Sequence, residues 1–168
     1  MPVTRLSELL SIDKEELTAR VRKGKYLPQP ILGVEIPKRN GKIRLLGIPT
    51  VTDRLLQQAV LQVITARFEF EFSDSSYGFR PGRSVQQAVS KAQGYINEGF
   101  QYIVDIDLKT FFDEVDHRYL LQLLYRKIKC HETMRLIRKW LRSPIQINGK
   151  LVKRRKGVPQ GSPLSSLL

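Results

Sequence analysis

The chain is poor in the residues that cross-link or metallate small proteins. It has one cysteine, Cys130, and two histidines, His117 and His131. A single cysteine excludes an intramolecular disulfide framework, and one cysteine with two histidines disfavours a four-ligand zinc site. Such cysteine usage fits a reducing compartment, so we expect a cytoplasmic protein.

Long apolar runs are also missing. No run approaches the ~20 residues that would span a bilayer. The amino-terminal stretch MPVTRLSELLSIDKEEL has neither the long apolar segment nor the small-residue cleavage site of a secretory signal. We therefore expect no membrane partner.

Acidic residues are scarce. Sixteen Asp and Glu stand against twenty-nine Lys and Arg, which gives a formal net charge of +13. A field of this sign attracts polyanions whatever their sequence, so nucleic acid is the first candidate partner. A membrane surface fits less well, because the basic residues are spread along the whole chain and do not line one amphipathic helix.

What the chain does contain suffices for a packed core: it has 168 residues, of which 41% are hydrophobic. Caps and apolar residues at i, i+3 and i+4 spacing predict helices. These helices are expected over residues 11–23, 52–70 and 84–98, and over most of 117–143. Thr50 and Asp53 predict a capping box at the start of the second helix.

Two asparagine-glycine pairs predict tight hairpin turns. Asn40-Gly41 lies between expected strands at 34–37 and 42–48, and Asn148-Gly149 lies in the stretch that ends at a glycine- and proline-containing loop. The loop SDSSYGFRPGRSV separates two segments, so we place a boundary near residue 85 and expect units at 1–85 and 86–168. The final SPLSSLL resembles the first turn of a helix, and we expect a fragment of a longer protein.

The stretch IVDIDLKTFFDEVDH gathers five of the sixteen acids. Tyr102 to Asp107 is rich in strand-forming residues, and along a strand Asp105 and Asp107 would share one face with roughly 6 to 7 Å between their carboxylates. That pair suits Mg²⁺, although salt bridges to nearby lysines would equally explain it. The remaining acids of the stretch, from Asp113 to Asp116, fit the amino-terminal ends of helices.

Four segments in order carry a family resemblance: IPKRNGKIRLLGIPT, SYGFRPGRSVQQAV, DIDLKTFFDEVDH and GVPQGSPLSSLL. Together they resemble the reverse transcriptases encoded by bacterial group II introns; retron, diversity-generating and CRISPR-associated reverse transcriptases are the competing families. The resemblance implies an α+β fold of the right-hand polymerase type. We expect an amino-terminal extension and fingers in 1–85, and the rest of the fingers with an incomplete palm in 86–168.

The same resemblance implies a metal and nucleotide site. Asp107 matches the catalytic palm aspartate that binds Mg²⁺, with Mn²⁺ as an alternative, and the backbone carbonyl of Leu108 is implied as a further ligand. Asp105 would support the site from behind. Phe112 matches the aromatic residue beneath the incoming sugar, a steric gate against a 2′-hydroxyl group.

Further positions match family residues that bind substrates. Lys38 and Arg44 match residues that hold the triphosphate of the incoming deoxynucleotide (dNTP), and Gln160 matches one that contacts its sugar and phosphates. A charged hairpin tip would also serve solubility alone. Arg80 and Arg83 match a loop that contacts the template-primer duplex; alternatively, that loop is structural and its aromatic residues anchor it to the core.

The sequence departs from the family in one respect: no two aspartates are adjacent anywhere in it. Enzymes of this family need such a pair as a second metal-binding segment. We therefore expect a longer parent to be the RNA-directed DNA polymerase, which also binds its group II intron RNA as a maturase, and this chain alone to be inactive. The alternative is a non-catalytic RNA-binding module for intron recognition. An exposed palm edge predicts self-association.

Overall fold

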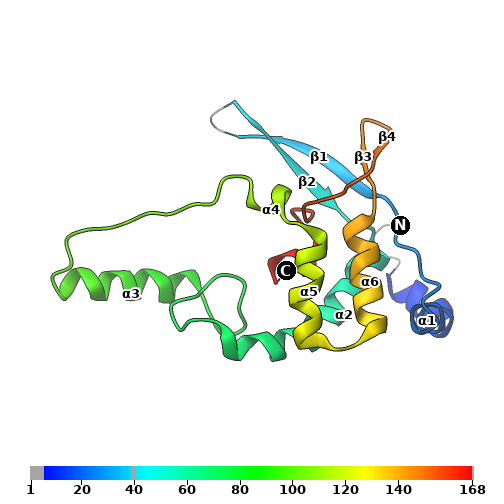
Figure 1. Cartoon of the computed structure of the whole chain (residues 1–168), viewed down its shortest axis with the longest axis horizontal. Helices are drawn as coiled ribbons and strands as arrows, with labels where there is room; N and C mark the ends of the chain where they lie inside the picture. The colour runs from blue at the N-terminus through cyan, green and yellow to red at the C-terminus, as the bar shows by residue number, and fades with distance from the viewer. Residues whose placement is uncertain (1–5, 39–40, 168) are drawn as a thin grey trace.

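The computed structural model describes residues 6–38 and 41–167, apart from the side chains of residues 8–10 and 12 (Figure 1). It confirms the predicted α+β class. The elements in chain order are α1 (Leu6–Arg22), β1 (Ile31–Pro37), β2 (Ile43–Ile48), α2 (Val51–Phe68), η2 (Glu69–Glu71), α3 (Val85–Asn97), α4 (Phe111–Glu114), α5 (His117–Ile128), α6 (His131–Arg142), β3 (Ile145–Ile147), β4 (Lys150–Val152) and η3 (Pro163–Ser166).

Both predicted hairpins form, and together they make one sheet. β1 pairs antiparallel with β2, and β3 pairs antiparallel with β4. The sequence did not reveal that β1 also pairs in parallel with β3, through Ile31 opposite Ile145, which gives the order β2-β1-β3-β4. The second turn has positive φ at both Asn148 and Gly149, as a type I′ turn requires. Asn40 of the first turn lies outside the described residues.

The core lies where α2, α5 and α6 meet. Each helix contributes apolar residues from one face, including Ile64 from α2, Leu124 from α5 and Ile137 from α6, which is fully buried. Thr50 caps α2 as predicted, because its hydroxyl oxygen accepts from the Asp53 N–H. The helical region predicted over 117–143 is two helices, since Lys129 at φ +49 ends α5 and lets the chain reverse.

Asp53 is the most highly connected polar residue of the core. Its side chain is 1% exposed. One carboxylate oxygen accepts from the Tyr26 hydroxyl at 2.8 Å and from the Trp140 indole N–H at 3.0 Å. The other accepts from the Thr50 hydroxyl at 2.7 Å and from the Gln29 N–H at 3.2 Å. The carboxylate therefore ties the segment before β1 to the start of α2 and the end of α6.

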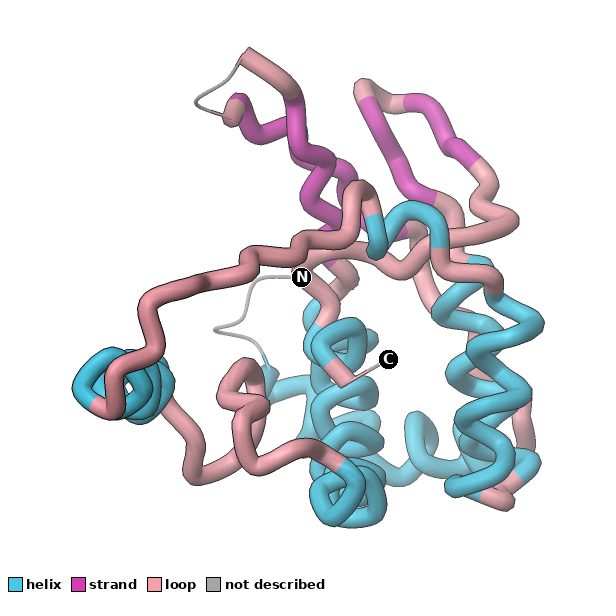
Figure 2. Tube along the Cα trace, turned by 60° about the vertical axis from the view of Figure 1, so that its left-hand side comes forward, coloured by secondary structure: helices cyan, strands magenta, loops and turns pink. Residues whose placement is uncertain are grey.

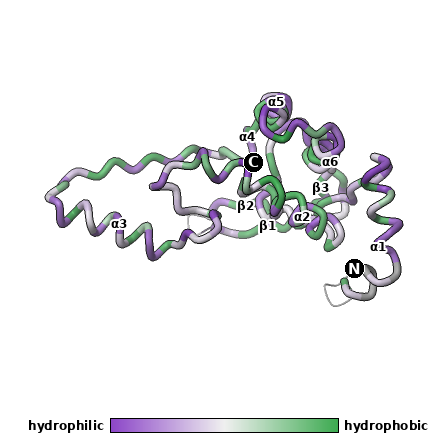
Figure 3. Tube along the Cα trace, turned by 90° about the horizontal axis from the view of Figure 1, so that it is seen from below, coloured by the Kyte–Doolittle hydropathy of each residue, from purple (hydrophilic) through white to green (hydrophobic). Residues whose placement is uncertain are grey.

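The predicted strand from Tyr102 to Asp107 is wrong. Residues 100–108 are irregular and exposed, and in the described part of the chain no strand pairs with them. Ile103 is 85% exposed and Ile106 is 81% exposed. A strand needs a neighbour for its backbone N–H and C=O groups, so a suitable side-chain pattern alone does not produce one. Figure 3 shows hydrophobic and hydrophilic residues alternating along this return from α3.

α3 stands at the far end of an arm, away from the α2, α5 and α6 bundle in both views (Figures 1 and 2). It forms as predicted because Ser84 and Gln87 make a complete capping box. None of its residues is buried. Elsewhere, α1 starts at Leu6, earlier than predicted, and α2 passes into η2 after Phe68.

No helix in the described parts of the chain is long and apolar enough to cross a membrane. The placement of the boundary near residue 85 stays a prediction. The shared sheet and the contacts of Asp53 do join residues from both sides of it.

The hydrogen bond from Tyr26 to Asp53 predicts a measurable loss of stability. Tyr26→Phe removes one donor from a buried carboxylate and should cost roughly 1–3 kcal/mol of unfolding free energy in urea titrations. Tyr119→Phe is the matched control, because Tyr119 is 63% exposed. Equal stability of the two variants would contradict this role of Tyr26.

The wild type and Tyr26→Phe also provide a test of how stability depends on pH. Burial, followed by the charge of Asp53, raises the pKa of Tyr26 above its ordinary value of 10.0. The fold thus favours the neutral phenol, whose contribution is complete below pH 10.0 and is lost as the pH rises beyond it. The stability difference between the wild type and Tyr26→Phe should therefore narrow above that pH.

Candidate nucleotide and nucleic-acid site

Two residues predicted to bind nucleotide, far apart in sequence, are hydrogen-bonded to each other. Arg44 on β2 donates from Nε to Oε1 of Gln160 at 2.5 Å. The Gln160 backbone is held as well, because its carbonyl accepts from the Gly47 N–H at 2.8 Å. β2 therefore fixes both the side chain and the main chain of Gln160.

The loop before Gln160 is fastened to the segment that carries Phe112. The Val158 N–H donates to the Phe112 carbonyl at 2.7 Å, and the Gly157 N–H donates to the Val115 carbonyl at 2.8 Å. Phe112 is half-buried, with its ring 5.7 Å from that of Phe111 in an edge-to-face arrangement. The structure thus brings Arg44, Gln160 and Phe112 to one region, beside a cavity of about 170 Å³ that Gln160 helps to line.

Arg154 and His117 both contact the Gly157 carbonyl in this loop. The role of Arg154 was not identified from the sequence. Its guanidinium donates to the carbonyls of Trp140, Leu141 and Ser143 at the end of α6, and to the carbonyl of Gly157. Burial lowers the pKa of Arg154 to about 10. His117 is buried, with Nε2 2.7 Å from the Gly157 oxygen.

The remaining predicted nucleotide residue, Lys38, is exposed near the end of β1. Its backbone N–H donates to the Lys42 carbonyl at 2.7 Å, which closes the hairpin. The side chain lies on the same hairpin as Arg44. The expected contact of Lys38 with the triphosphate stays a prediction.

The predicted metal ligands lie on the irregular segment. Asp105, Asp107 and Leu108 are all exposed, and neither aspartate forms a salt bridge within the described residues. Carboxylates are the oxygen donors that Mg²⁺ takes, so the chemistry of the pair fits. The number of ligands does not fit, because among the described residues no group of three or more acidic, histidine or cysteine side chains is placed to hold a metal ion.

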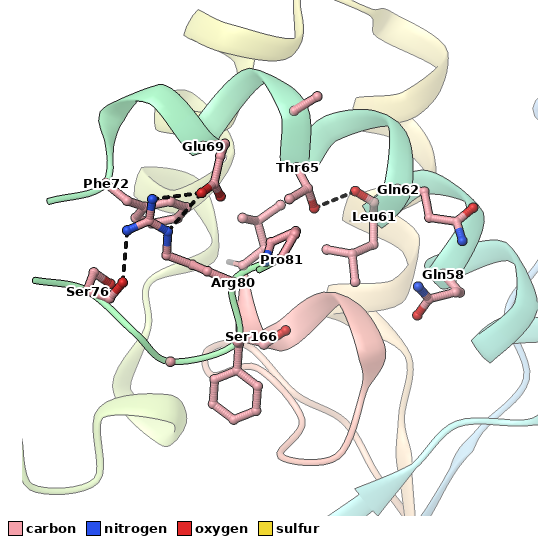
Figure 4. Close-up of a pocket in the computed structure, with 14 residues that line it drawn as sticks. Gln58, Leu61, Gln62, Thr65, Glu69, Phe72, Ser76, Arg80, Pro81 and Ser166 are labelled. Atoms are coloured by element: carbon pink, nitrogen blue, oxygen red, sulfur yellow. Dashed lines mark hydrogen bonds and ion pairs between the residues drawn. The ribbon is translucent and has the colours of Figure 1, made fainter. Parts of the chain in front are cut away.

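Arg80 is bonded inside its own loop (Figure 4). Its guanidinium donates to Glu69 Oε1 at 2.7 and 3.1 Å, and to the carbonyls of Ser73 and Ser76 at 2.7 and 2.8 Å. It also lies over the Phe72 ring, 5.2 Å from the centroid. The side chain is only 6% exposed. These contacts favour the structural alternative for Arg80.

Arg83 differs from Arg80 in its exposure. Its side chain is 29% exposed, lies over the Tyr77 ring, and contacts the exposed Asp74 at 3.4 Å. Phe79 does not anchor the loop, since it is 89% exposed. The loop, α2 and η3 surround a pocket of about 650 Å³. Phosphate contacts by Arg80 and Arg83 stay predictions.

Comparisons with known proteins identify the same family that the sequence motifs resemble. The family model "Reverse transcriptase (RNA-dependent DNA polymerase)" matches residues 36–168. Group II intron-encoded protein LtrA of Lactococcus lactis subsp. cremoris is 38% identical over 155 residues, covering 92% of this chain and 26% of the relative. Protein YkfC of Escherichia coli (strain K12) is 35% identical over 169 residues, covering 98% of this chain and 44% of the relative.

A solved structure is similar as well. A chain of the partial Cas6-RT-Cas1--Cas2 complex matches with a TM-score of 0.59 and 29% sequence identity, over 94% of this chain and 28% of that one. The chain spans less than half the length of each of these relatives.

The family match covers most of the chain, and the chain therefore belongs to the reverse transcriptase family, the RNA-dependent DNA polymerases. Within that family, the predicted similarity to group II intron-encoded proteins is confirmed.

Gly157 offers a test of how the Gln160 loop is held. Gly157 and Gly149 both have positive φ, at +80 and +78. A Cβ on Gly157 would lie 2.9 Å from the Asp113 carbonyl oxygen, whereas one on Gly149 meets nothing within 4 Å. Gly149→Ala should cost about 1 kcal/mol from the backbone conformation alone. Gly157→Ala should cost roughly 1–3 kcal/mol more in urea unfolding, and an equal loss would contradict the close packing.

Proposed function

We propose that the chain forms the part of an RNA-directed DNA polymerase that holds the incoming dNTP beside the template-primer duplex. The observation that carries the proposal is the hydrogen bond between Arg44 and Gln160. Both residues were expected at the nucleotide from separate motifs, and 116 positions of sequence separate them. The names of the relatives support the polymerase class.

The bond prepares Arg44 for phosphate. Because Nε donates to Gln160, the guanidinium is held in one orientation, and within the described residues its two terminal nitrogens have no other partner. Those nitrogens can then donate to a triphosphate as a pair. Lys38 adds a second positive charge from the same hairpin, and Phe112 lies beneath the sugar.

Mg²⁺ enters the proposal together with the nucleotide. Asp107 and the Leu108 carbonyl would supply two oxygen ligands, with Asp105 in support, and phosphate oxygens would supply others. In a longer parent protein, the reaction we propose is attack of a primer 3′-hydroxyl group on the α-phosphate of the dNTP, with RNA as template. A phosphodiester bond forms, the bond between the α- and β-phosphates breaks, pyrophosphate leaves, and the hydroxyl proton passes to solvent. Two carboxylates alone should hold Mg²⁺ or Mn²⁺ weakly.

Nucleotide binding is tested by titrating the 168-residue chain with a fluorescent dNTP in the presence of Mg²⁺. Arg44→Gln should weaken binding roughly tenfold or more, because a charge-assisted hydrogen bond to phosphate contributes about 1.5–3 kcal/mol. Arg22→Gln, an exposed change on α1, is the control. Failure of the wild type to bind, or equal binding by Arg44→Gln, would refute the proposed nucleotide site.

The same titration tests the proposed metal ligand, through the gain in dNTP affinity that Mg²⁺ provides. Asp107→Asn should reduce the gain in affinity that Mg²⁺ provides, because one oxygen ligand loses its charge. Glu98→Gln removes another exposed carboxylate, at the end of α3, and should leave that gain unchanged. If both variants respond alike, Asp107 is not a specific ligand.

A second candidate function is an RNA-binding module without chemistry, used to recognise intron RNA and assist splicing. It is favoured by the exposed, irregular segment that carries Asp105 and Asp107. Binding of structured intron RNA with no affinity for dNTP would support this alternative over the polymerase proposal. Both readings expect RNA as the partner.

Arg80 and Arg83 separate structural from RNA-binding roles within one loop. Arg80→Gln should lower stability by about 2 kcal/mol, since it leaves Glu69 without its partner. Arg83→Gln should leave stability unchanged and should make the dependence of log affinity on log salt shallower by about 0.7–0.9. A loss of RNA affinity by Arg80→Gln at unchanged stability would instead show a direct phosphate contact.

Self-association stays a prediction, and the irregular segment strengthens its basis because large apolar side chains are exposed along it, among them Tyr102 at 94% and Val104 at 82%. Light scattering at high concentration provides the measurement. A monodisperse monomer would contradict it.

A further inference from the structure

A groove follows the outer faces of α5 and α6, apart from the nucleotide site. Its volume is about 1160 Å³, and five arginines line it: Arg118, Arg126, Arg135, Arg138 and Arg142. The two helices are antiparallel neighbours joined at Lys129 and Cys130 (Figure 1). Each helix has 12 residues and is therefore about 18 Å long.

Helical spacing explains how the arginines come to one surface. On α6, Arg135, Arg138 and Arg142 follow at intervals of three and four, which places them in one row. Arg118 and Arg126 of α5 line the same groove. The opposite faces of both helices are apolar and buried in the core, so the arginine rows are fixed to a rigid support.

The lysines of the same helices have other partners. Lys127 pairs with Glu71, and Lys139 donates to the carbonyls of Gly24 and Tyr26 at 2.8 and 2.7 Å. In contrast, the side chains of Arg126, Arg138 and Arg142 are exposed and form no hydrogen bond or salt bridge with any described residue. The structure thus separates the cations that hold the fold from those that face solvent.

Acidic residues near the first turns of the two helices neutralise the groove only in part. None of its lining residues is acidic. Asp116 caps α5 and interacts with Arg118, while the single acid of α6, Glu132, accepts from the Cys130 thiol and interacts with Arg135. Arg126, Arg138 and Arg142 have no such acidic neighbour among the described residues. Like charges at i, i+3 and i+4 repel and lower helix stability, so a polyanion in the groove would relieve this cost.

We propose that this groove binds the phosphate backbone of structured RNA at a second surface, separate from the nucleotide and the template-primer duplex. Arginine forms paired hydrogen bonds with phosphate, and its plane also stacks on bases. Tyr125 and His131 form a ring pair at the helix junction, with centroids 5.4 Å apart, and Tyr125 is 43% exposed. Such a ring offers a stacking surface for an unpaired base.

At the other end of the groove, one residue connects it to the loop of the candidate site. His117 lines the groove, and its Nε2 is hydrogen-bonded to the Gly157 carbonyl beneath the loop of Gln160. An RNA bound along α5 and α6 would therefore lie next to a residue that holds this loop. The proposal needs no dNTP affinity, so it can fail or succeed independently of the proposed function.

The test compares two triple variants of the full chain. Arg126→Gln, Arg138→Gln and Arg142→Gln together remove three charges from the groove. The control removes three exposed charges from α1 and the residue that follows it, Lys14→Gln, Arg22→Gln and Lys23→Gln, beside a smaller groove that also contains Glu15. The probe is a fluorescently labelled RNA hairpin, titrated by anisotropy between 50 and 200 mM salt.

The groove variant should bind at least tenfold more weakly at the lower salt concentration. The slope of log affinity against log salt should become shallower by about 2–3, because each phosphate contact contributes ~0.7–0.9. The α1 variant should lose clearly less. Unchanged melting temperatures establish that both variants are folded, and unchanged dNTP binding by the groove variant places the loss outside the nucleotide site.

Three results would overturn the proposal. Equal losses in the two variants would mean that RNA responds only to net charge. Unchanged RNA binding by the groove variant would mean that the arginine rows are a solvated face. Polyglutamate and unlabelled RNA, added at equal charge, can also compete with the labelled hairpin. If both displace it equally well, the arginines do not distinguish phosphate from carboxylate, and the groove would be a surface for an acidic protein.

Discussion

The buried carboxylate of Asp53 is the interaction on which the rest of the structure depends. A carboxylate removed from water is costly unless donors satisfy it, and here four donors from three separate segments do so. Tyr26 and Gln29 lead directly into β1, while Trp140 lies at the end of the helix that leads into β3. The two strands whose pairing joins the hairpins are therefore both positioned from one charged group.

The candidate site is linked to that group through α6. Trp140 donates to Asp53 with its indole N–H, while its carbonyl accepts from Arg154. Arg154 also donates to the Gly157 carbonyl, which is hydrogen-bonded to His117 as well. Gln160 follows three residues later and meets Arg44. Hydrogen bonds and one short stretch of chain thus link the core to the proposed nucleotide site, so a loss of order at Asp53 would affect the loop that positions Gln160.

The features predicted correctly from sequence are those that neighbouring residues determine. Asn148-Gly149 defines its own turn, and Ser84 with Gln87 caps α3 without help from other elements. Asp53 was predicted only as part of a cap, because Tyr26 and Trp140 lie 27 and 87 positions away. The strand expected at Tyr102 to Asp107 failed for the same reason, since its alternating side chains say nothing about whether another strand lies beside them. Local patterns also could not show that Arg80 bonds within its own loop.

Arg80 illustrates why the net charge alone does not locate an RNA surface. The formal charge of +13 counts Arg80, Lys139 and Arg154 equally with Arg138, yet the first three donate to carbonyls or carboxylates of the fold. These donors are already bound, and moving them to phosphate would leave buried acceptors without partners. Only cations whose donors face solvent can release counterions from a nucleic acid at little structural cost. Sorting the basic residues by their existing hydrogen bonds therefore sets aside the cations that hold the fold, and among those that remain the groove of α5 and α6 gathers five arginines on one surface.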